Sequence, residues 1–131
     1  MLRFPSGIPA LVTRVHARGL MFGLYTSESV KTCAAYPGSR GFEALDAGTF
    51  ARWGIDYLKV DACGDMDYYA TGYPAIARAI HASGRSITLA CSWAAYLGDV
   101  ESQVPFQQFI DIGCNNDRFG YDIRCNWRCH H

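Results

Sequence analysis

The feature that most constrains the fold is a regular alternation of amphipathic helical segments and short apolar runs. Helices are predicted over residues 7–19, 46–53, 73–83 and, from a weaker pattern, around 100–108. The apolar runs that predict strands are Leu20–Tyr25, Ile55–Asp61, Ser86–Cys91 and Phe109–Cys114. Helices and strands in this order indicate an α/β protein with a parallel sheet.

Local signals place the ends of these segments. Gly19, Gly54 and Gly84 follow the first three predicted helices and are expected to stop them. Asp46 is expected to be the N-cap residue of the second helix.

Polar side chains follow the carboxyl ends of the predicted strands: Tyr25, Asp61, Ser92 and Asn115 with Arg118. A (β/α)8 barrel keeps its active site at these strand ends. Such a barrel has eight strands and this chain has about four, so we expect a partial barrel. No glycine-rich phosphate-binding motif follows a strand, which argues against nucleotide binding.

Composition narrows the class of partner. The 12 basic and 12 acidic residues balance, and this argues against nucleic acid or a membrane surface as partner. No apolar stretch is long enough to predict a membrane span. Aromatic residues make up 14% of the chain, which suits a carbohydrate site but equally an ordinary aromatic core.

The six cysteines indicate an oxidising compartment. None of them forms a C-x-x-C motif, which argues against a zinc or redox site. Cys125 and Cys129 with His130 and His131 could be a metal cluster or a loose chain end. The first residues lack the apolar core of a signal peptide, so we expect the chain to begin inside a longer secreted protein.

Lys59 and Asp61 are two residues apart on a predicted strand and therefore point to the same face. Charges in such a place are either paired with each other or functional, and the spacing leaves both interpretations open. Asp122 offers a second carboxylate, and glycoside hydrolysis needs two. Several other aspartates are also available, so the residues alone do not choose among them.

Several segments, in order, resemble the lysosomal α-galactosidase and α-N-acetylgalactosaminidase family. They are Arg3–Ile8, Gly19–Tyr25, Lys31–Ser39 and Ala51–Cys63, and the resemblance runs from about Arg3 to Arg118. It implies that residues 1–131 are a fragment of the catalytic (β/α)8 barrel, holding its third to sixth strands. The family's first two strands, its last two strands and its C-terminal β-domain are not in the chain.

The resemblance also implies roles for single residues. Asp61 matches the nucleophile of a retaining double displacement and Asp122 the general acid/base, with no metal or organic cofactor. Lys59 on the same face would favour ionised Asp61. The matches that line the sugar pocket are Tyr25, Lys59 and Arg118. The implied disulfides are Cys33 with Cys63 and Cys91 with Cys114.

The segment Cys91–Tyr96 bears on the choice of sugar. In the resembled family this turn reads the substituent at sugar position 2, and α-galactosidases carry Glu and Leu where this chain has Ser92 and Ala95. The smaller pair leaves room for an N-acetyl group, which favours α-N-acetylgalactosamine, with Tyr96 also expected in the pocket. An α-galactosidase whose turn has drifted in sequence is the alternative.

The match weakens near the chain's end. Asp117 stands where the family has Trp, and Arg124 and Cys125 depart from the residues that follow the acid/base, although Trp127 still aligns. Asp122 is therefore assigned on less evidence than Asp61.

The resemblance implies terminal α-GalNAc or α-Gal of glycolipids, glycoproteins or oligosaccharides as substrates, and a homodimeric, lysosomal or secreted parent enzyme. We expect poor hydrolysis, or none, from the fragment alone. A third hypothesis, of another class, is a stable non-catalytic domain that binds sugar.

Overall fold

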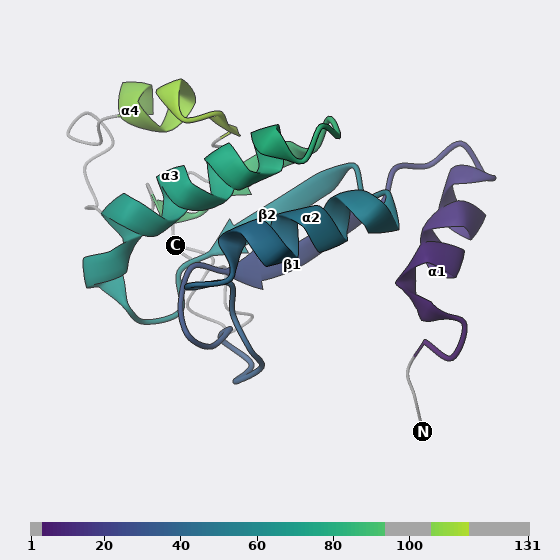
Figure 1. Ribbon diagram of the computed structural model, residues 1–131, viewed down its shortest axis with the longest axis horizontal. Helices are drawn as coiled ribbons and strands as arrows, with labels where there is room; N and C mark the ends of the chain where they lie inside the picture. Colours follow the sequence, from purple (N-terminus) through teal and green to yellow (C-terminus); the bar gives the residue numbers. More distant parts are fainter. Residues whose placement is uncertain (1–3, 94–105, 116–131) are drawn as a thin grey trace, which may run out of the picture.

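The computed structural model describes residues 4–93 and 106–115 of the chain. Its strands are β1 (Gly23–Ser27), β2 (Tyr57–Asp61), β3 (Thr88–Cys91) and β4 (Cys114–Asn115), and its helices are α1 (Gly7–His16), α2 (Glu43–Trp53), α3 (Met66–Ala82) and α4 (Phe106–Asp111). The strands form one sheet in chain order, and every neighbouring pair is parallel. Helices and strands alternate (Figure 1), which confirms the predicted partial (β/α)8 barrel.

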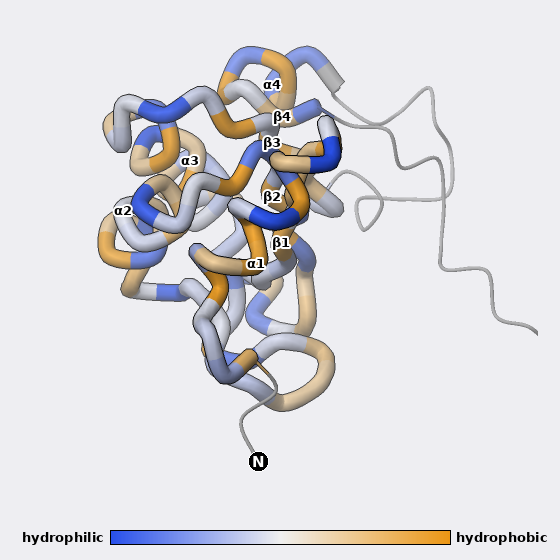
Figure 2. Tube along the Cα trace, turned by 90° about the vertical axis from the view of Figure 1, so that its right-hand side faces the viewer, coloured by the Kyte–Doolittle hydropathy of each residue, from blue (hydrophilic) through white to orange (hydrophobic). Residues whose placement is uncertain are grey.

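The centre of the core is β2, whose residues alternate between two faces of the sheet. Leu58 and Val60 are fully buried on one face, in a cluster with Ala47 of α2 and Ile76 of α3. Hydrophobic colour runs through the central strands in Figure 2. The burial of this one face under helices explains why the strand reads as an apolar run interrupted by Lys59 and Asp61.

A column of aromatic rings connects α3 to α4. Tyr73 stacks on Trp93 with ring centroids 5.6 Å apart, and Trp93 meets Phe109 edge to face at 4.6 Å. Such pairs contribute about 0.5–1.5 kcal/mol each beyond the area they bury. The column therefore holds the last described helix against the rest of the core.

The second helix ends where predicted but begins earlier. Gly54 has φ of 80°, a left-handed conformation that glycine adopts without steric cost. The helix starts at Glu43, and Asp46 is not its N-cap: the Asp46 carboxylate accepts a hydrogen bond from the Ser39 hydroxyl at 2.8 Å. The prediction of an Asp46 cap was wrong because this carboxylate has a partner outside the helix.

The third helix begins seven residues before the predicted start at Tyr73. It includes Pro74, which normally interrupts a helix because it lacks an N–H. The early turns are retained because Tyr69 and Tyr73 are buried in the core. Although α3 is the longest described helix, no helix in this part of the chain is long and apolar enough to cross a membrane.

Two predicted strands have other limits. The run Leu20–Tyr25 is displaced along the chain, since β1 starts at Gly23 and Leu20 and Met21 are exposed. The run Phe109–Cys114 was wrong as a strand: Phe109 points into the core from helix α4, and only Cys114 and Asn115 join the sheet. Periodicity cannot separate a short buried strand from a short buried helix.

One carboxylate joins several elements at the amino ends of the strands. Asp56 accepts hydrogen bonds from the Phe22 N–H at 2.8 Å and from Arg85 at 2.8 Å, and it lies 2.7 Å from the His16 ring. The Phe22 N–H, then His16 and Arg85, hold the pKa of Asp56 below its usual range despite some desolvation. This carboxylate therefore connects α1, β1 and the start of β3 to β2.

We predict that Asp56→Ala lowers the free energy of unfolding by about 1–3 kcal/mol at neutral pH, because it leaves several donors without their acceptor. Urea unfolding measures this. Because the folded pKa of Asp56 is lowered, its contribution is present above the unfolded carboxyl pKa and disappears as pH falls through the folded value. The free energies of unfolding of the Asp56→Ala variant and of the unaltered chain should therefore converge as the pH is lowered.

The matched control is Asp111→Ala, which removes an exposed carboxylate of α4 whose partner is Gln107. It should change stability little. Equal losses from both substitutions would contradict the role given to Asp56.

Candidate active site

The candidate site lies at the carboxyl end of β2, on the face that points away from Leu58 and Val60. Tyr25 pairs in register with Lys59, and Ser27 pairs with Asp61. Tyr25, Lys59 and Asp61 therefore project on one side of two adjacent parallel strands. The structure brings these three predicted site residues together.

The Asp61 carboxylate is fixed by two donors. The Ala62 N–H donates to Oδ1 at 2.9 Å, and the Tyr25 hydroxyl donates to Oδ2 at 2.9 Å. The residue is only 9% exposed. A buried carboxylate with both oxygens bonded has a defined orientation, as a catalytic carboxylate needs.

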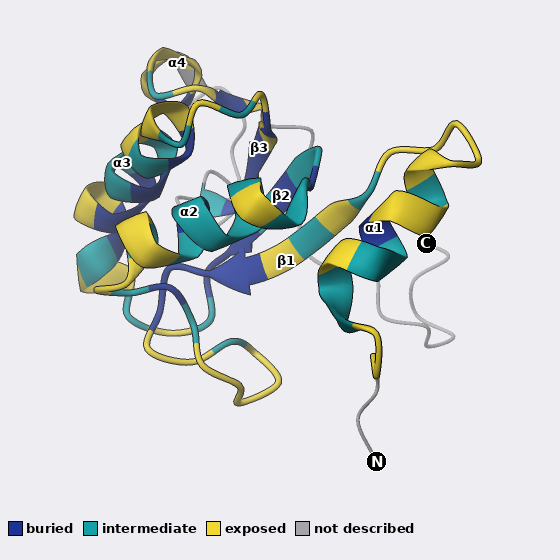
Figure 3. Cartoon of the chain, turned by 45° about the vertical axis from the view of Figure 1, so that its right-hand side comes forward, coloured by how far each residue is buried: buried dark blue, intermediate teal, exposed yellow. Residues whose placement is uncertain are grey.

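The main chain of Asp61 is held by the end of β1. Its carbonyl oxygen accepts the Glu28 N–H at 3.0 Å and the Ser27 hydroxyl at 3.1 Å. The β1 end is buried while its start is more exposed, as Figure 3 shows. The position of Asp61 therefore depends on the segment that follows β1.

The side chain of Lys59 accompanies Tyr25. Its Nζ lies 6.0 Å from the centroid of the Tyr25 ring, at the outer limit of a cation–π contact. Tyr25 itself is 44% exposed, on the strand at one edge of the described sheet.

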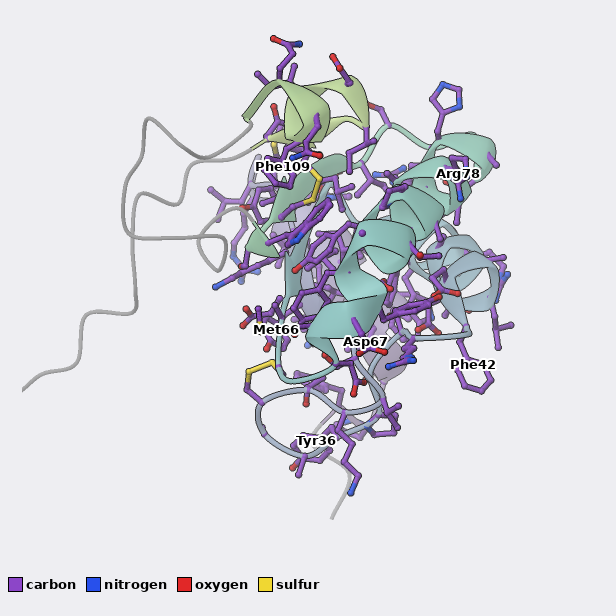
Figure 4. The ribbon with its side chains drawn as sticks, turned by 90° about the vertical axis from the view of Figure 1, so that its left-hand side faces the viewer. Tyr36, Phe42, Met66, Asp67, Arg78 and Phe109 are labelled. Atoms are coloured by element: carbon purple, nitrogen blue, oxygen red, sulfur yellow. A yellow bond between two sulfur atoms is a disulfide. The ribbon has the colours of Figure 1, made fainter. Side chains whose placement is uncertain are left out.

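Both disulfides that the resemblance implies are present. Cys33 is bonded to Cys63 and Cys91 to Cys114, with Cα atoms 5.0 and 5.5 Å apart. Figure 4 shows one bridge near the loop that carries Tyr36 and the other near Phe109. The first attaches the loop after β1 to the residue two places after Asp61.

The first bridge also touches the site. Cys33 Sγ lies 3.9 Å from Asp61 Oδ2, and the Tyr25 hydroxyl lies 3.3 Å from Cys63 Sγ. A disulfide sulfur carries no hydrogen, so the first approach is a packing contact. Cys33, Asp61 and Cys63 lie close enough to suggest a metal site, but the two sulfurs are bonded to each other in a disulfide and offer no thiolate to a metal ion.

Ser92 lies beside the end of β2. Its N–H donates to the Val60 oxygen at 3.0 Å, and the residue is 3% exposed. The other predicted site residues, Ala95, Tyr96, Arg118 and Asp122, lie outside the described residues. So do Cys125 and Cys129.

The sequence interpretation missed a second set of contacts around the loop after β1. Arg40 lies over the Tyr68 ring at 4.4 Å and pairs with Asp65 at 3.3 Å. Asp65 also accepts a hydrogen bond from the Val30 N–H. This bond lowers the pKa of Asp65, and the pairing with Arg40 lowers it to a smaller extent. Asp65 precedes α3, where an N-cap is expected, but its side chain bonds no helix N–H and instead holds the loop.

Comparison with known proteins decides the family. The profile of the melibiase family described as alpha galactosidase A matches residues 1–131. The chain belongs to this family. It is 41% identical over 128 residues to Homo sapiens alpha-galactosidase A, covering 96% of the chain and 29% of that protein. It is 42% identical over 127 residues to Homo sapiens alpha-N-acetylgalactosaminidase, covering 95% of the chain and 31% of that protein.

Solved structures agree on the fold. An alpha-galactosidase from Saccharomyces cerevisiae with raffinose superposes with TM-score 0.64 at 32% identity, covering 73% of the chain and 24% of that protein. A solved structure from Bacteroides fragilis superposes with TM-score 0.77 at 33% identity, and the match covers 92% of this chain and 25% of that protein. The chain thus spans about three tenths of the length of the curated relatives it matches.

We predict that replacing both Cys33 and Cys63 by Ser lowers the free energy of unfolding by about 3–4 kcal/mol, because the bridge closes a loop with a sequence separation of 30. Thermal unfolding of the oxidised proteins measures this loss. A melting temperature equal to that of the unaltered chain would contradict the loop's dependence on the bridge.

Proposed function

We propose that the chain is part of a retaining α-glycosidase in which Asp61 is the nucleophile. The observation that carries this proposal is the Asp61 carboxylate at the carboxyl end of β2, held by Tyr25 and Ala62 on the face that Lys59 shares. Family membership supports glycoside hydrolysis as the reaction class. Strand ends are also where (β/α)8 barrels place catalytic groups.

In the proposed reaction an Asp61 oxygen attacks the anomeric carbon while Asp122 gives its proton to the departing glycosidic oxygen. Water then attacks the covalent glycosyl intermediate. Asp122 takes the proton from that water, and the bond between sugar and Asp61 breaks. Retention of configuration follows from the two inversions, and the two carboxyl groups should lie roughly 5–5.5 Å apart.

The proposed sugar is terminal α-N-acetylgalactosamine on glycolipids, glycoproteins or oligosaccharides. Ser92 is buried beside the end of β2, and we propose that Ser92 and Ala95 form a small residue pair beside sugar position 2. Tyr96 and Arg118 would complete the pocket. An α-galactosidase is the second candidate, because the relatives named above include both activities at nearly equal identity.

We further propose that the segment acts within a longer, homodimeric enzyme that is lysosomal or secreted. Two disulfides in the described residues support an oxidising compartment. The first two and last two strands of a complete barrel would supply the remaining sugar contacts. Alone, the segment should hydrolyse poorly or not at all, and sugar binding without turnover would favour a non-catalytic domain.

The nucleophile can be tested in a chimaera whose matching segment in Homo sapiens alpha-N-acetylgalactosaminidase is replaced by this chain. Asp61→Asn should reduce kcat for a nitrophenyl α-N-acetylgalactosaminide by about a thousandfold or more. The control Asp67→Asn removes an exposed carboxylate in the next helix. Retained turnover in the Asp61 variant would refute the assignment.

The same chimaera tests the sugar. Ser92→Glu with Ala95→Leu should change the ratio of kcat/KM for α-galactoside to α-N-acetylgalactosaminide by roughly ten- to hundredfold towards galactose, because the larger pair fills the N-acetyl space. Parallel assays with the two nitrophenyl substrates measure the ratio. An unchanged ratio would contradict the proposed preference for α-N-acetylgalactosamine.

A further inference from the structure

Glu28, directly after β1, is a buried carboxyl group with no ordinary partner. The residue is fully buried, and neither of its carboxyl oxygens accepts a hydrogen bond from a donor in the described part of the chain. Leaving such a group unpaired costs free energy, and leaving it charged costs more. The residues around Glu28 must therefore offset the free-energy cost of burying its carboxyl group.

Both helices above the sheet contribute to those surroundings. From α3, Gly72 lies so close that a Cβ there would be 2.6 Å from Glu28 Oε2, and the Tyr68 ring borders the same space. From α2, Glu43 and Asp46 act on Glu28 with negative charge. The cation Arg40 lies over the Tyr68 ring and pairs with Asp65 and Asp67.

Glu43 is the acceptor of this cluster. The Tyr68 hydroxyl and the Gly41 N–H both donate to its Oε1. Burial opposes ionisation of Glu43, but these hydrogen bonds outweigh burial and lower its pKa. Glu43 is therefore ionised and can accept a further proton donor.

We propose that Glu28 is a protonated carboxylic acid that donates its hydrogen to Glu43, and that this shared proton locks the end of β1 under Asp61. Two ionised carboxylates cannot hydrogen-bond to each other, since neither has a hydrogen to donate. One proton on Glu28 supplies the missing donor and removes the buried charge at the same time. No cation is then needed in the cluster.

The pKa supports this arrangement. Burial, followed by the negative charges of Glu43 and Asp46, raises the pKa of Glu28 from its ordinary 4.5 to about 8. The hydrogen bond with Glu43 acts in the same direction. Near neutral pH the folded chain therefore holds a proton that the unfolded chain has released.

The lock reaches the site through the main chain. The Glu28 N–H donates to the Asp61 carbonyl oxygen, and Ser29 Oγ accepts the Cys63 N–H at 3.2 Å. Glu28 is thus a positioning residue for Asp61, and this part of the inference rests on the proposed function. The shared proton itself does not depend on that function.

A carboxyl NMR titration of the 131-residue chain tests the proton directly. The chain contains only three glutamates, Glu28, Glu43 and Glu101, so carbon-13 labelling of glutamate gives three side-chain carboxyl signals. One signal, absent in Glu28→Gln, should titrate near pH 8. Titration of every glutamate carboxyl in the ordinary acidic range would overturn the proposal.

Thermal unfolding tests the consequence. Because the folded pKa of Glu28 is raised, its contribution to stability is complete below the unfolded pKa and falls as pH rises towards about 8. Glu28→Gln cannot titrate yet keeps a donor, so its melting temperature should lose this dependence, while Asp111→Asn should follow the unaltered chain. Parallel curves for all three proteins would contradict the lock. If Glu28→Gln does not fold, Glu43→Gln and Glu101→Gln assign the wild-type NMR signals by elimination.

Turnover separates the two proposals. In an active chimaera, Glu28→Gln should shift the alkaline limb of the kcat/KM pH profile to higher pH, because glutamine keeps a donor and cannot ionise. If the chimaera is inactive, the proposed function fails and the NMR titration still decides whether Glu28 holds a proton.

Discussion

The hydrogen bonds between the end of β1 and the carbonyl oxygen of Asp61 are the contacts on which the candidate site depends. They continue the parallel pairing of β1 with β2 by one more residue and place the Tyr25 hydroxyl within reach of the Asp61 carboxylate. The Cys33–Cys63 bridge closes the same region covalently. The backbone hydrogen bonds, the disulfide and the Tyr25 hydroxyl together restrain the site. These restraints favour one orientation of the Asp61 carboxylate.

The two faces of the sheet at β2 lie in different environments. One face of β2 is an apolar core with Leu58 and Val60 at its centre, and the helices that cover it also enclose Glu28. The other face carries Tyr25, Lys59 and Asp61, and of these Tyr25 is exposed. A protonated acid behind the sheet and a bonded carboxylate in front of it are therefore one strand apart. The shared proton is how we account for a buried glutamate that feels the negative charges of Glu43 and Asp46.

The sequence was most informative where one physical rule decides the outcome. Alternation along β2 placed Lys59 and Asp61 on one face. Gly54 ended α2 because its backbone adopts the left-handed conformation, which glycine accepts without steric cost. It failed where tertiary packing competes with a local rule. Burial of Tyr73 and Tyr69 carries α3 through Pro74, and burial of Phe109 favours a helix over a strand. Glu28 gave no local signal, because its environment comes from helices far away in the chain.

Asp61 is the residue that we propose carries the covalent glycosyl intermediate. The most direct measurement is peptide mass spectrometry after an active chimaera has been inactivated with a fluorinated glycoside, whose intermediate hydrolyses slowly. If Asp61 is the nucleophile, a single sugar adduct should appear on the peptide that contains Asp61, and it should be lost when the unfluorinated substrate competes. An adduct on a different carboxylate, with Asp61 unmodified, would contradict it.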